Sequence, residues 1–281
     1  MLAYRHAFHA GNHADVLKHI TLMMLLRHMA AKNKPFRYID THSGAGGYSL
    51  EGPYAQKKNE YELGVGRLWG QVDLPSAVSD YIGLVRQFNP DGVLRQYPGS
   101  PALAQMILRK DDQLRLFEMH PTDHRILSIF MADSSSQATV YRADGFEGLK
   151  AQVPPSSRRG LVLMDPSYEV GADYSKIVSS LRDALSRFAT GVYMVWYPHI
   201  QKLEAVQLPK RLQSLAPKAW LHVRLTVQKS DSQGFGLLGS GVFVINPPHT
   251  LHAELQAVLP FLTKALGQFE EASHLLIQHV V

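Results

Sequence analysis

The chain contains no cysteine among its 281 residues. This absence excludes disulfide bonds, thiolate metal sites and cysteine nucleophiles. No stretch approaches the roughly 18 apolar residues without charge that a membrane-spanning helix needs, and the first residues lack the layout of a signal peptide. Internal repeats and low-complexity tracts are also missing. We therefore expect a cytoplasmic protein with no membrane partner, since a chain without cysteine suits a reducing compartment.

Apolar and basic side chains are present in quantity. Apolar residues make up 45% of the sequence, which is enough for a large core. The formal net charge is +5, with 14 histidines in addition, and this balance favours a polyanionic partner such as nucleic acid. The basic groups that could hold phosphates are Arg5, His6, Lys57, Lys58, Arg158 and Arg159.

The stretch 160–168, GLVLMDPSY, is the most informative part of the sequence. Its apolar run is typical of a strand buried on both faces of a parallel sheet. Pro166 cannot continue a central strand, so a loop follows at the carboxyl end, where open α/β sheets bind ligands. There the Asp165 carboxylate and the Pro166 carbonyl can accept hydrogen bonds from the exocyclic amine of a planar base, while Tyr168 stacks on its ring. The alternative for these residues is a strand-end turn with a solvated acid.

Apolar strands alternate with helical stretches along most of the chain. The expected strands lie at 36–40, 114–118, 139–142, 161–164 and 191–196, followed by an antiparallel pair at 221–227 and 241–245 and an edge strand at 275–281. Helices are expected at 101–108 and 249–266, and from Asn12 or His13 to about Met29. This order predicts an α/β fold with a doubly wound, Rossmann-like sheet.

The spacing of two motifs predicts an insertion in this fold. In a nucleotide-binding unit, the acid that binds ribose hydroxyls follows the glycines by roughly 20 residues. Here Glu118 follows Gly46 by 72 residues. We therefore expect a small, mostly helical subdomain at 50–95 within a main domain formed by 1–49 and 96–281. Residues 1–13 are expected to form an extended N-terminal arm that ends at a Gly11-Asn12 turn.

Three successive strands end in an acid. Asp40 is followed by Gly44 and Gly46, and the pattern D-x-x-x-G-x-G favours an adenosine-containing cofactor. Glu118 and Asp144 follow the next two strands, where Asp144 can accept a hydrogen bond from an adenine amine. Ordinary glycine and Asp-Gly turns are the alternatives. Ser100, in the sequence PGSP, suits either a helix cap or a cofactor contact.

Together these motifs resemble class I S-adenosylmethionine-dependent methyltransferases of the adenine-N6 type, whose tetrapeptide is (Asp/Asn)-Pro-Pro-(Tyr/Phe/Trp). Four longer segments resemble the RlmJ family, and they are YRHAFHAGNHADVLKH at 4–19, DTHSGAGGY at 40–48, YPGSP at 97–101 and RRGLVLMDPSYE at 158–169. Members of that family methylate N6 of one adenosine in 23S ribosomal RNA. The resemblance covers nearly the whole chain, and it implies S-adenosylmethionine as cofactor and 23S ribosomal RNA as partner. We expect a monomer that uses no metal.

The resemblance also implies residue roles. Asp165 would be the catalytic residue and would border the methionine part of the cofactor. Tyr4, Pro166 and Tyr168 would contact the target nucleotide. The cofactor pocket would be formed by His19, His42, Gly44 and Ser100, with Glu118 on the ribose, Asp144 and Gly145 on the adenine, and Lys18 in support. Ser167 stands where the family has its second proline, so we expect the chemistry to be retained in a less preorganised loop.

Other functions remain open at this point. A DNA adenine methyltransferase shares the chemistry, although the target-recognition domain expected of one is missing. A protein glutamine methyltransferase would prefer Asn at position 165, and a nicotinamide dehydrogenase would need Gly or Ala where Ser49 stands. A non-catalytic RNA-binding module and a metal site on His9 and His13 are the remaining alternatives.

Overall fold

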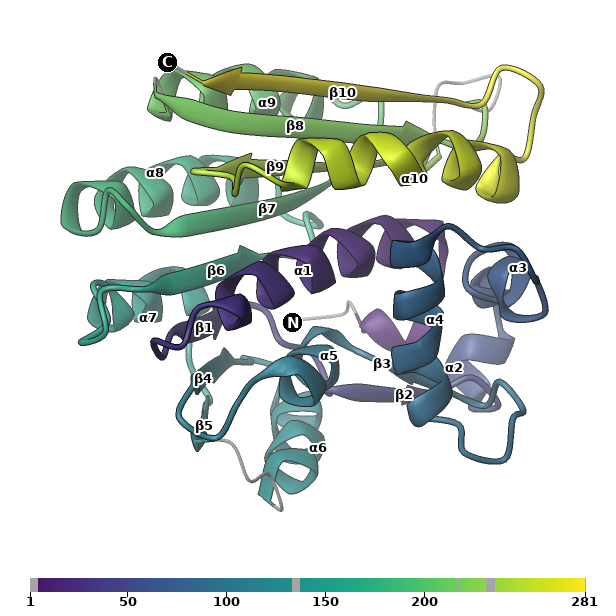
Figure 1. Ribbon diagram of the computed structural model, residues 1–281, viewed down its shortest axis with the longest axis horizontal. Coiled ribbons are helices and arrows are strands. Elements are labelled where there is room, and N and C mark those ends of the chain that lie inside the picture. Colours follow the sequence, from purple (N-terminus) through teal and green to yellow (C-terminus); the bar gives the residue numbers. More distant parts are fainter. Residues whose placement is uncertain (1–4, 133–136, 217, 231–235, 281) are drawn as a thin grey trace.

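One eight-stranded sheet lies between two layers of helices (Figure 1). The computed structural model describes residues 5–132, 137–216, 218–230 and 236–280. The strands are β1 Arg37–Asp40, β2 Gly47–Ser49, β3 Gln96–Pro98, β4 Gln113–Phe117, β5 Gln137–Tyr141, β6 Gly160–Met164, β7 Val192–His199, β8 Ala219–Thr226, β9 Gly239–Ile245 and β10 Ser273–Val280. The large sheet has the order β10-β8-β9-β7-β6-β1-β4-β5, while β2 and β3 form a separate antiparallel pair.

Five neighbouring strands of the large sheet run parallel, and three more strands are added antiparallel on one side. Strands β1, β4, β5, β6 and β7 run parallel, whereas β9, β8 and β10 are added antiparallel. The predicted closing pair and edge strand are therefore confirmed. The fifth strand is longer than predicted, because Pro198 pairs with Ser240 of β9 in a part of β7 that extends beyond β6. A proline is tolerated there, since no strand on that side needs its missing N–H.

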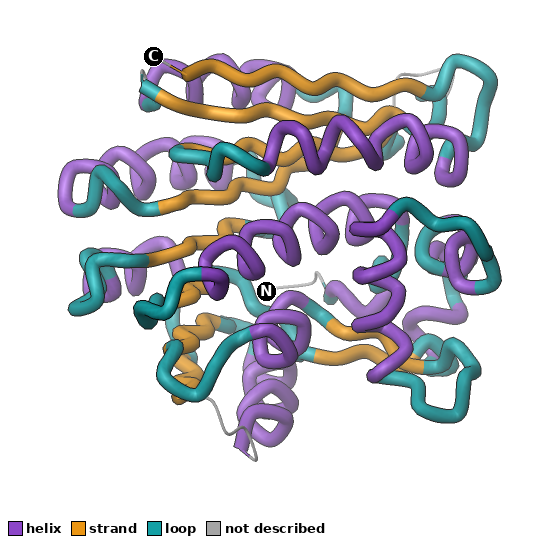
Figure 2. Tube along the Cα trace, viewed as in Figure 1, coloured by secondary structure: helices purple, strands orange, loops and turns teal. Residues whose placement is uncertain are grey.

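Helices cover both faces of the sheet (Figure 2). They are α1 His13–Ala31, α2 Pro53–Gln56, α3 Gly66–Trp69, α4 Ser76–Gln87, α5 Ser100–Ile107, α6 Pro121–Ala132, α7 Gly145–Gln152, α8 Ala172–Arg187, α9 Leu203–Leu215 and α10 Leu251–Leu266. Side chains of α1, α5, α6 and α10 share one apolar core with alternate strand residues such as Leu161 and Leu163, while α7, α8 and α9 pack on Val162 and Met164. Every residue of β6 is buried, as its apolar run predicted.

Helix α1 crosses the middle of the sheet and is buried along most of its length. It begins where predicted, because the Asn12 side chain accepts hydrogen bonds from the amides of Ala14 and Asp15 at 2.9 and 3.0 Å. A cap of this kind satisfies amides that the first helical turn leaves unpaired. The cap places Lys18 and His19 on the first two turns, next to the carboxyl ends of β1 and β6.

The inserted segment 50–95 is helical, with α2, α3, α4 and the 3₁₀ turn η2 Glu60–Leu63, and β2 and β3 close its base. Its buried side chains Val65, Leu68, Val78 and Tyr81 belong to the same apolar core as α1. The insertion therefore has no core of its own among the described residues.

The arm is not extended in the residues that the structure describes. His6–Phe8 form a 3₁₀ turn, η1, closed by the hydrogen bond from the amide of His9 to the carbonyl of His6. The predicted turn at Gly11 is present, with φ +78°. The amide of Val65 donates to the Gly11 carbonyl at 2.8 Å, so the insertion holds the base of the arm.

Candidate active site

A cavity of about 280 Å³ opens at the carboxyl ends of the parallel strands. It lies beside β1, from which β4 and β5 extend the sheet on one side and β6 and β7 on the other. Ligands of open α/β sheets bind at such a switch point. The predicted site residues that line the cavity are Lys18, His19, His42, Gly44, Ser100, Glu118, Asp144, Asp165 and Pro166. Gly145 and Tyr168 are not among the lining residues, and Tyr4 lies outside the described residues.

Glu118 follows β4 and joins it to the glycine loop after β1. Its carboxylate accepts hydrogen bonds from the amide of Gly44 at 2.9 Å and from the amide of His120 at 2.6 Å. Burial raises the pKa of Glu118, although both amides favour the charged form. The side chain is only partly buried, so its oxygens can accept further hydrogen bonds from a ligand in the cavity.

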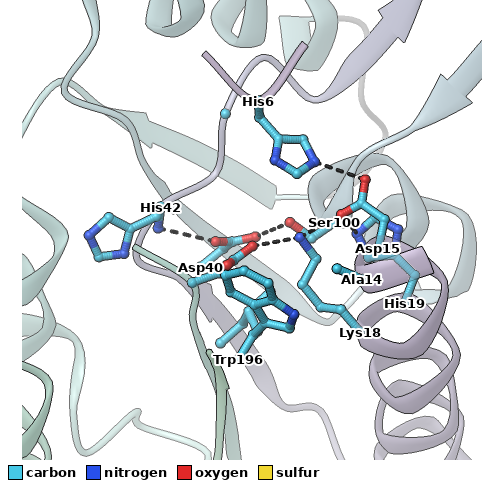
Figure 3. Close-up of polar contacts among 12 residues, drawn as sticks. His6, Ala14, Asp15, Lys18, His19, Asp40, His42, Ser100 and Trp196 are labelled. Atoms are coloured by element: carbon cyan, nitrogen blue, oxygen red, sulfur yellow. Dashed lines mark hydrogen bonds and ion pairs between the residues drawn. The ribbon is translucent and has the colours of Figure 1, made fainter. Parts of the chain in front are cut away.

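Asp40, at the end of β1, is fully buried and anchors the same loop from below. It accepts hydrogen bonds from the hydroxyl of Ser100 at 2.7 Å and from the amide of His42 at 3.2 Å (Figure 3). The hydroxyl of Tyr38 also donates to it, at 2.9 Å. Burial raises its pKa to about 6 in spite of these donors. Ser100 is therefore not the helix cap that the sequence allowed. The N-cap position of α5 is Gly99, and Ser100 instead directs its hydroxyl at Asp40.

The adenine end of the predicted pocket is built around α7. Asp144 caps this helix by accepting a hydrogen bond from the amide of Phe146 at 2.8 Å, and it lines the cavity. His42 packs edge-on against the Phe146 ring, and burial lowers the pKa of His42 to about 4. Gly145 contributes by its lack of a side chain, because a Cβ would lie 1.9 Å from the carbonyl oxygen of Thr41. Gly145 therefore allows α7 to pack closely on the end of β1.

His19 lines the cavity, and one of its ring nitrogens is buried without a hydrogen-bond partner among the residues that the structure describes. Its Nδ1 is 2.7 Å from the hydroxyl of Tyr97, whereas its buried Nε2 has no hydrogen-bond partner within the described part of the chain. Burial lowers the pKa of His19 to about 3, so the ring is neutral at physiological pH. An unpaired buried nitrogen is costly unless a ligand satisfies it. Together with the carboxylates of Glu118 and Asp144, it fits a ligand that has hydroxyl and amine groups, as S-adenosylmethionine does.

Asp165 lies at the end of β6, and Lys18 holds it. The ammonium of Lys18 is 2.6 Å from Asp165 Oδ2 and 2.8 Å from Asp15 Oδ1. Burial raises the pKa of Asp165, and the Lys18 charge offsets this only in part. Within the described residues no hydrogen-bond partner is found for Asp165 Oδ1. That oxygen and the neighbouring Pro166 are therefore available at the cavity.

Tyr168 does not lie where the sequence predicted it. Its ring is 6% exposed, packs against Tyr174 and Trp196 in the core, and its hydroxyl donates to the carbonyl of Trp196. Its φ is +57°, so the loop turns sharply at this residue. The turn directs the side chain into the apolar core between the sheet and α8. In this structure Tyr168 supports the loop, and Pro166 and Ser167 face the cavity.

Several residues of the site were not predicted. Asp15 contacts Lys18 from one helical turn away, and this i,i+3 spacing of opposite charges was a usable signal. His120, Asp123 and Lys176 also line the cavity, but nothing in their sequence context distinguishes them.

Four of the predicted phosphate-binding groups already have partners. Arg5 forms an ion pair with Asp123 at 2.6 Å, and His6 Nε2 lies 2.8 Å from Asp15 Oδ2. Lys58 pairs with Glu60 at 3.7 Å, and Arg159 donates to the carbonyl of Met29 at 2.7 Å. Within residues 5–132, 137–216, 218–230 and 236–280, no group of three or more His, Asp or Glu side chains could hold a metal ion. Of the helices in these ranges, none is long and apolar enough to cross a membrane.

The doubly wound sheet, the acids after β1, β4 and β5, and the Asp-Pro loop after β6 define a class I methyltransferase, whose methyl donor is S-adenosylmethionine. The chain belongs to the family described as "Ribosomal RNA large subunit methyltransferase D, RlmJ", whose model matches residues 33–279.

Individual relatives support this assignment. The chain is 46% identical to the ribosomal RNA large subunit methyltransferase J of Escherichia coli (strain K12), over 95% of this chain and 94% of that protein. It is 44% identical to the protein of the same name from Haemophilus influenzae, with the same coverage of both chains. A crystal structure of a protein from Legionella pneumophila superposes with a TM-score of 0.89 at 36% identity, covering 96% of this chain and 98% of that one.

Proposed function

We propose that this chain transfers a methyl group from S-adenosylmethionine to the exocyclic N6 of a specific adenosine in 23S ribosomal RNA. The observation that carries the proposal is Asp165, which is held by Lys18 at the cavity with one carboxylate oxygen still available. The family and its relatives support an RNA of the large ribosomal subunit as substrate. The proposal includes a monomer that acts in the cytoplasm, where this RNA is found.

The cavity residues would hold the cofactor along its length. Glu118 would accept hydrogen bonds from the ribose hydroxyls, and Asp144 from the adenine amine. His19 Nε2 would gain a polar partner at the other end. When bound, the cofactor supplies an electrophilic methyl group on a sulfonium.

Asp165 and Pro166 would activate the target amine. The lone pair of an adenine amine is conjugated into the ring, which makes the nitrogen a poor nucleophile. Hydrogen bonds from its two N–H groups to Asp165 Oδ1 and the Pro166 carbonyl favour a tetrahedral nitrogen, whose lone pair is free. Positioning of this kind provides much of the rate enhancement.

Asp165 is also suited to receive the proton. Methyl transfer would form an N–C bond and break the S–C bond of the sulfonium, whose electron pair stays on the departing thioether. The amine nitrogen would then carry the positive charge, and loss of one N–H proton would restore neutrality. Burial raises the pKa of Asp165, which makes the carboxylate a better proton acceptor than a solvated aspartate. The target base must leave its stack to reach the cavity, as bases do in other enzymes that modify them.

The test is an assay of methyl incorporation into 23S ribosomal RNA from a strain that lacks this gene, with nucleoside mass spectrometry to identify the product. We expect N6-methyladenosine with the wild-type protein and a loss of at least about 100-fold in Asp165→Ala, which removes the oxygens that would accept the hydrogen bond and the proton. Asp183→Ala is the matched control, because Asp183 is an acid on α8 outside the cavity, paired with Arg187 at 2.9 Å. Full activity of Asp165→Ala would contradict the mechanism. Methylation of duplex DNA in preference to RNA, or RNA binding without methyl transfer, would contradict the substrate or the activity.

A further inference from the structure

Asp15 is a buried carboxylate that the proposed mechanism does not use. Its side chain is 1% exposed and it is not among the residues that line the cavity. It nevertheless has contacts with three residues, two in the arm and one on its own helix. Oδ2 lies 2.8 Å from His6 Nε2 (Figure 3). The same oxygen accepts a hydrogen bond from the amide of Gly11 at 2.9 Å, while Oδ1 lies 2.8 Å from Lys18 Nζ.

A buried carboxylate is costly, so its contacts indicate what it is retained for. Taking an acid out of water costs several kcal/mol, and apolar residues often replace buried ion pairs without loss of stability. Burial alone would raise the pKa of Asp15, but His6 and Lys18 bring it well below the usual value. Asp15 is therefore ionised, and one ammonium group lies between two buried carboxylates, Asp15 and Asp165.

This arrangement determines how much of the Lys18 charge reaches Asp165. Burial lowers the pKa of Lys18, but Asp15 and Asp165 raise it further than burial lowers it, so the ammonium stays charged. Both carboxylates attract this one cation, and each weakens the hold of the other on it. With Asp15 absent, Lys18 would neutralise Asp165 more completely and compete with the substrate amine for its oxygens.

We propose that Asp15 is a positioning residue for Asp165. It fixes the Lys18 ammonium on the α1 side and shares its charge, so that Lys18 orients the Asp165 carboxylate without neutralising it. Through His6 and Gly11, the same carboxylate connects the folded arm to this position. The inference rests on the proposed function, because it assigns Asp15 a part in the activation of the target amine.

The titratable groups that act on Asp165 come from several elements. Lys18 on α1 and His6 on η1 lower the pKa of Asp165, whereas Asp15 raises it. Asp165 in turn raises the pKa of Asp40, at the end of β1. Removal of the Asp15 charge should therefore lower the pKa of Asp165 and shift the acid limb of the kcat profile to lower pH. General loss of structure would not move the limb in this direction.

The first test is Asp15→Asn, which keeps the size of the side chain and removes its charge. We expect kcat on 23S ribosomal RNA to fall about 10- to 100-fold, the acid limb to move to lower pH, and KM for S-adenosylmethionine to stay within about twofold. The matched control is Asp112→Asn. Asp112 is fully buried and ion-paired with Arg109, but it lies outside the cavity. It should lower the melting temperature and leave kcat per folded molecule and the pH profile unchanged.

The second test is a double-mutant cycle with Lys18→Met. If Asp15 acts through Lys18, the variant with both substitutions has the same kcat as Lys18→Met alone. This comparison remains available if Asp15→Asn does not fold, because it needs only Lys18→Met and the double variant. Lys18→Met leaves both Asp15 and Asp165 without their cation, whereas the double variant leaves only Asp165 without it.

Three results would overturn the inference. The first is that Asp15→Asn keeps the wild-type kcat and pH profile, and the second is that its activity falls only in proportion to its folded fraction. The third is that the double variant has a lower kcat than Lys18→Met alone. Failure of the proposed function is recognised separately, since in that case the wild-type protein itself does not methylate the RNA.

Discussion

Glu118 provides a quantitative test of how the cavity binds its cofactor. Both of its oxygens accept backbone hydrogen bonds, from Gly44 and His120, and both retain capacity for a ligand hydroxyl. In Glu118→Gln, the new NH₂ group must face one of these two amides, donor against donor. The substitution therefore removes the negative charge and one acceptor while the side chain keeps nearly the same volume.

The expected loss follows from the number of bonds affected. A hydrogen bond to a charged group contributes roughly 1.5–3 kcal/mol, so loss of one from a ribose hydroxyl should weaken binding about 10- to 150-fold. Because Glu118 touches no reacting atom in the proposed mechanism, kcat at saturating cofactor should change less than about threefold. Burial raises the pKa of Glu118, so wild-type affinity should also decline as the pH falls through that raised value.

Titration calorimetry with S-adenosylmethionine and with S-adenosylhomocysteine measures this effect. The control is Glu147→Gln, because Glu147 is an exposed acid on α7 that pairs with Lys150 and does not line the cavity. Its Kd should stay within about twofold of the wild type. A folded Glu118→Gln variant whose Kd is also within twofold would refute the assignment of Glu118 to the cofactor ribose.

Three further predictions concern stability. The folded-state pKa of Asp40 is about 6, above its ordinary value, so the folded protein binds more protons than the unfolded chain between these values and loses stability as the pH rises through them. When the pH is lowered from about 7.5 to 5, the free energy of unfolding of the wild type, measured with urea, should therefore rise by on the order of 1 kcal/mol relative to that of Asp40→Asn. A difference between the two proteins that does not change with pH would contradict this. Tyr168→Phe should lower the free energy of unfolding by about 1 kcal/mol in the same assay and keep the methylation rate within about threefold of the wild type. A large loss of activity would assign the hydroxyl a role beyond support of the loop. Gly145→Ala should lower the free energy of unfolding by more than about 2 kcal/mol, because the new Cβ would overlap a carbonyl oxygen. Gly83→Ala, in open space on α4, should be neutral or stabilising. Equal thermal stabilities of the two variants would show that the close packing at Gly145 is unimportant.

The strands could be predicted from the sequence because burial on both faces leaves a direct trace. All five residues of β6 are apolar or glycine, and all are buried. The glycine loop, the acid Glu118 and the Asp-Pro turn after β6 were predicted as parts of one site because parallel strands bring their carboxyl ends together. The structure places all three at the cavity. The carboxyl end of the fifth strand, β7, was not predicted. Pro198 is tolerated there only because β7 extends beyond β6, and the sequence does not show this difference in length.

The direction of each side chain could not be predicted in the same way. Tyr168 was expected at the target base, but a left-handed backbone turn directs it into the core. Ser100 was expected as a helix cap or a cofactor contact. It is not the cap of α5, and although it lines the cavity, its hydroxyl donates to Asp40. Such outcomes depend on a few backbone torsions and on partners far away in the sequence. Local propensity depends only on neighbouring residues, so it does not predict them.

The amino-acid sequence by itself determined the α/β architecture and the chemical groups at the strand ends, because these follow from periodicity and chain direction. Only the tertiary structure decided which charges share a buried space. Lys18 and Asp165 are separated by 147 residues, and their contact at 2.6 Å exists because α1 packs across β6, β7 and β9. Electrostatic interactions depend on distance and burial in three dimensions, and neither quantity can be read from positions along the chain.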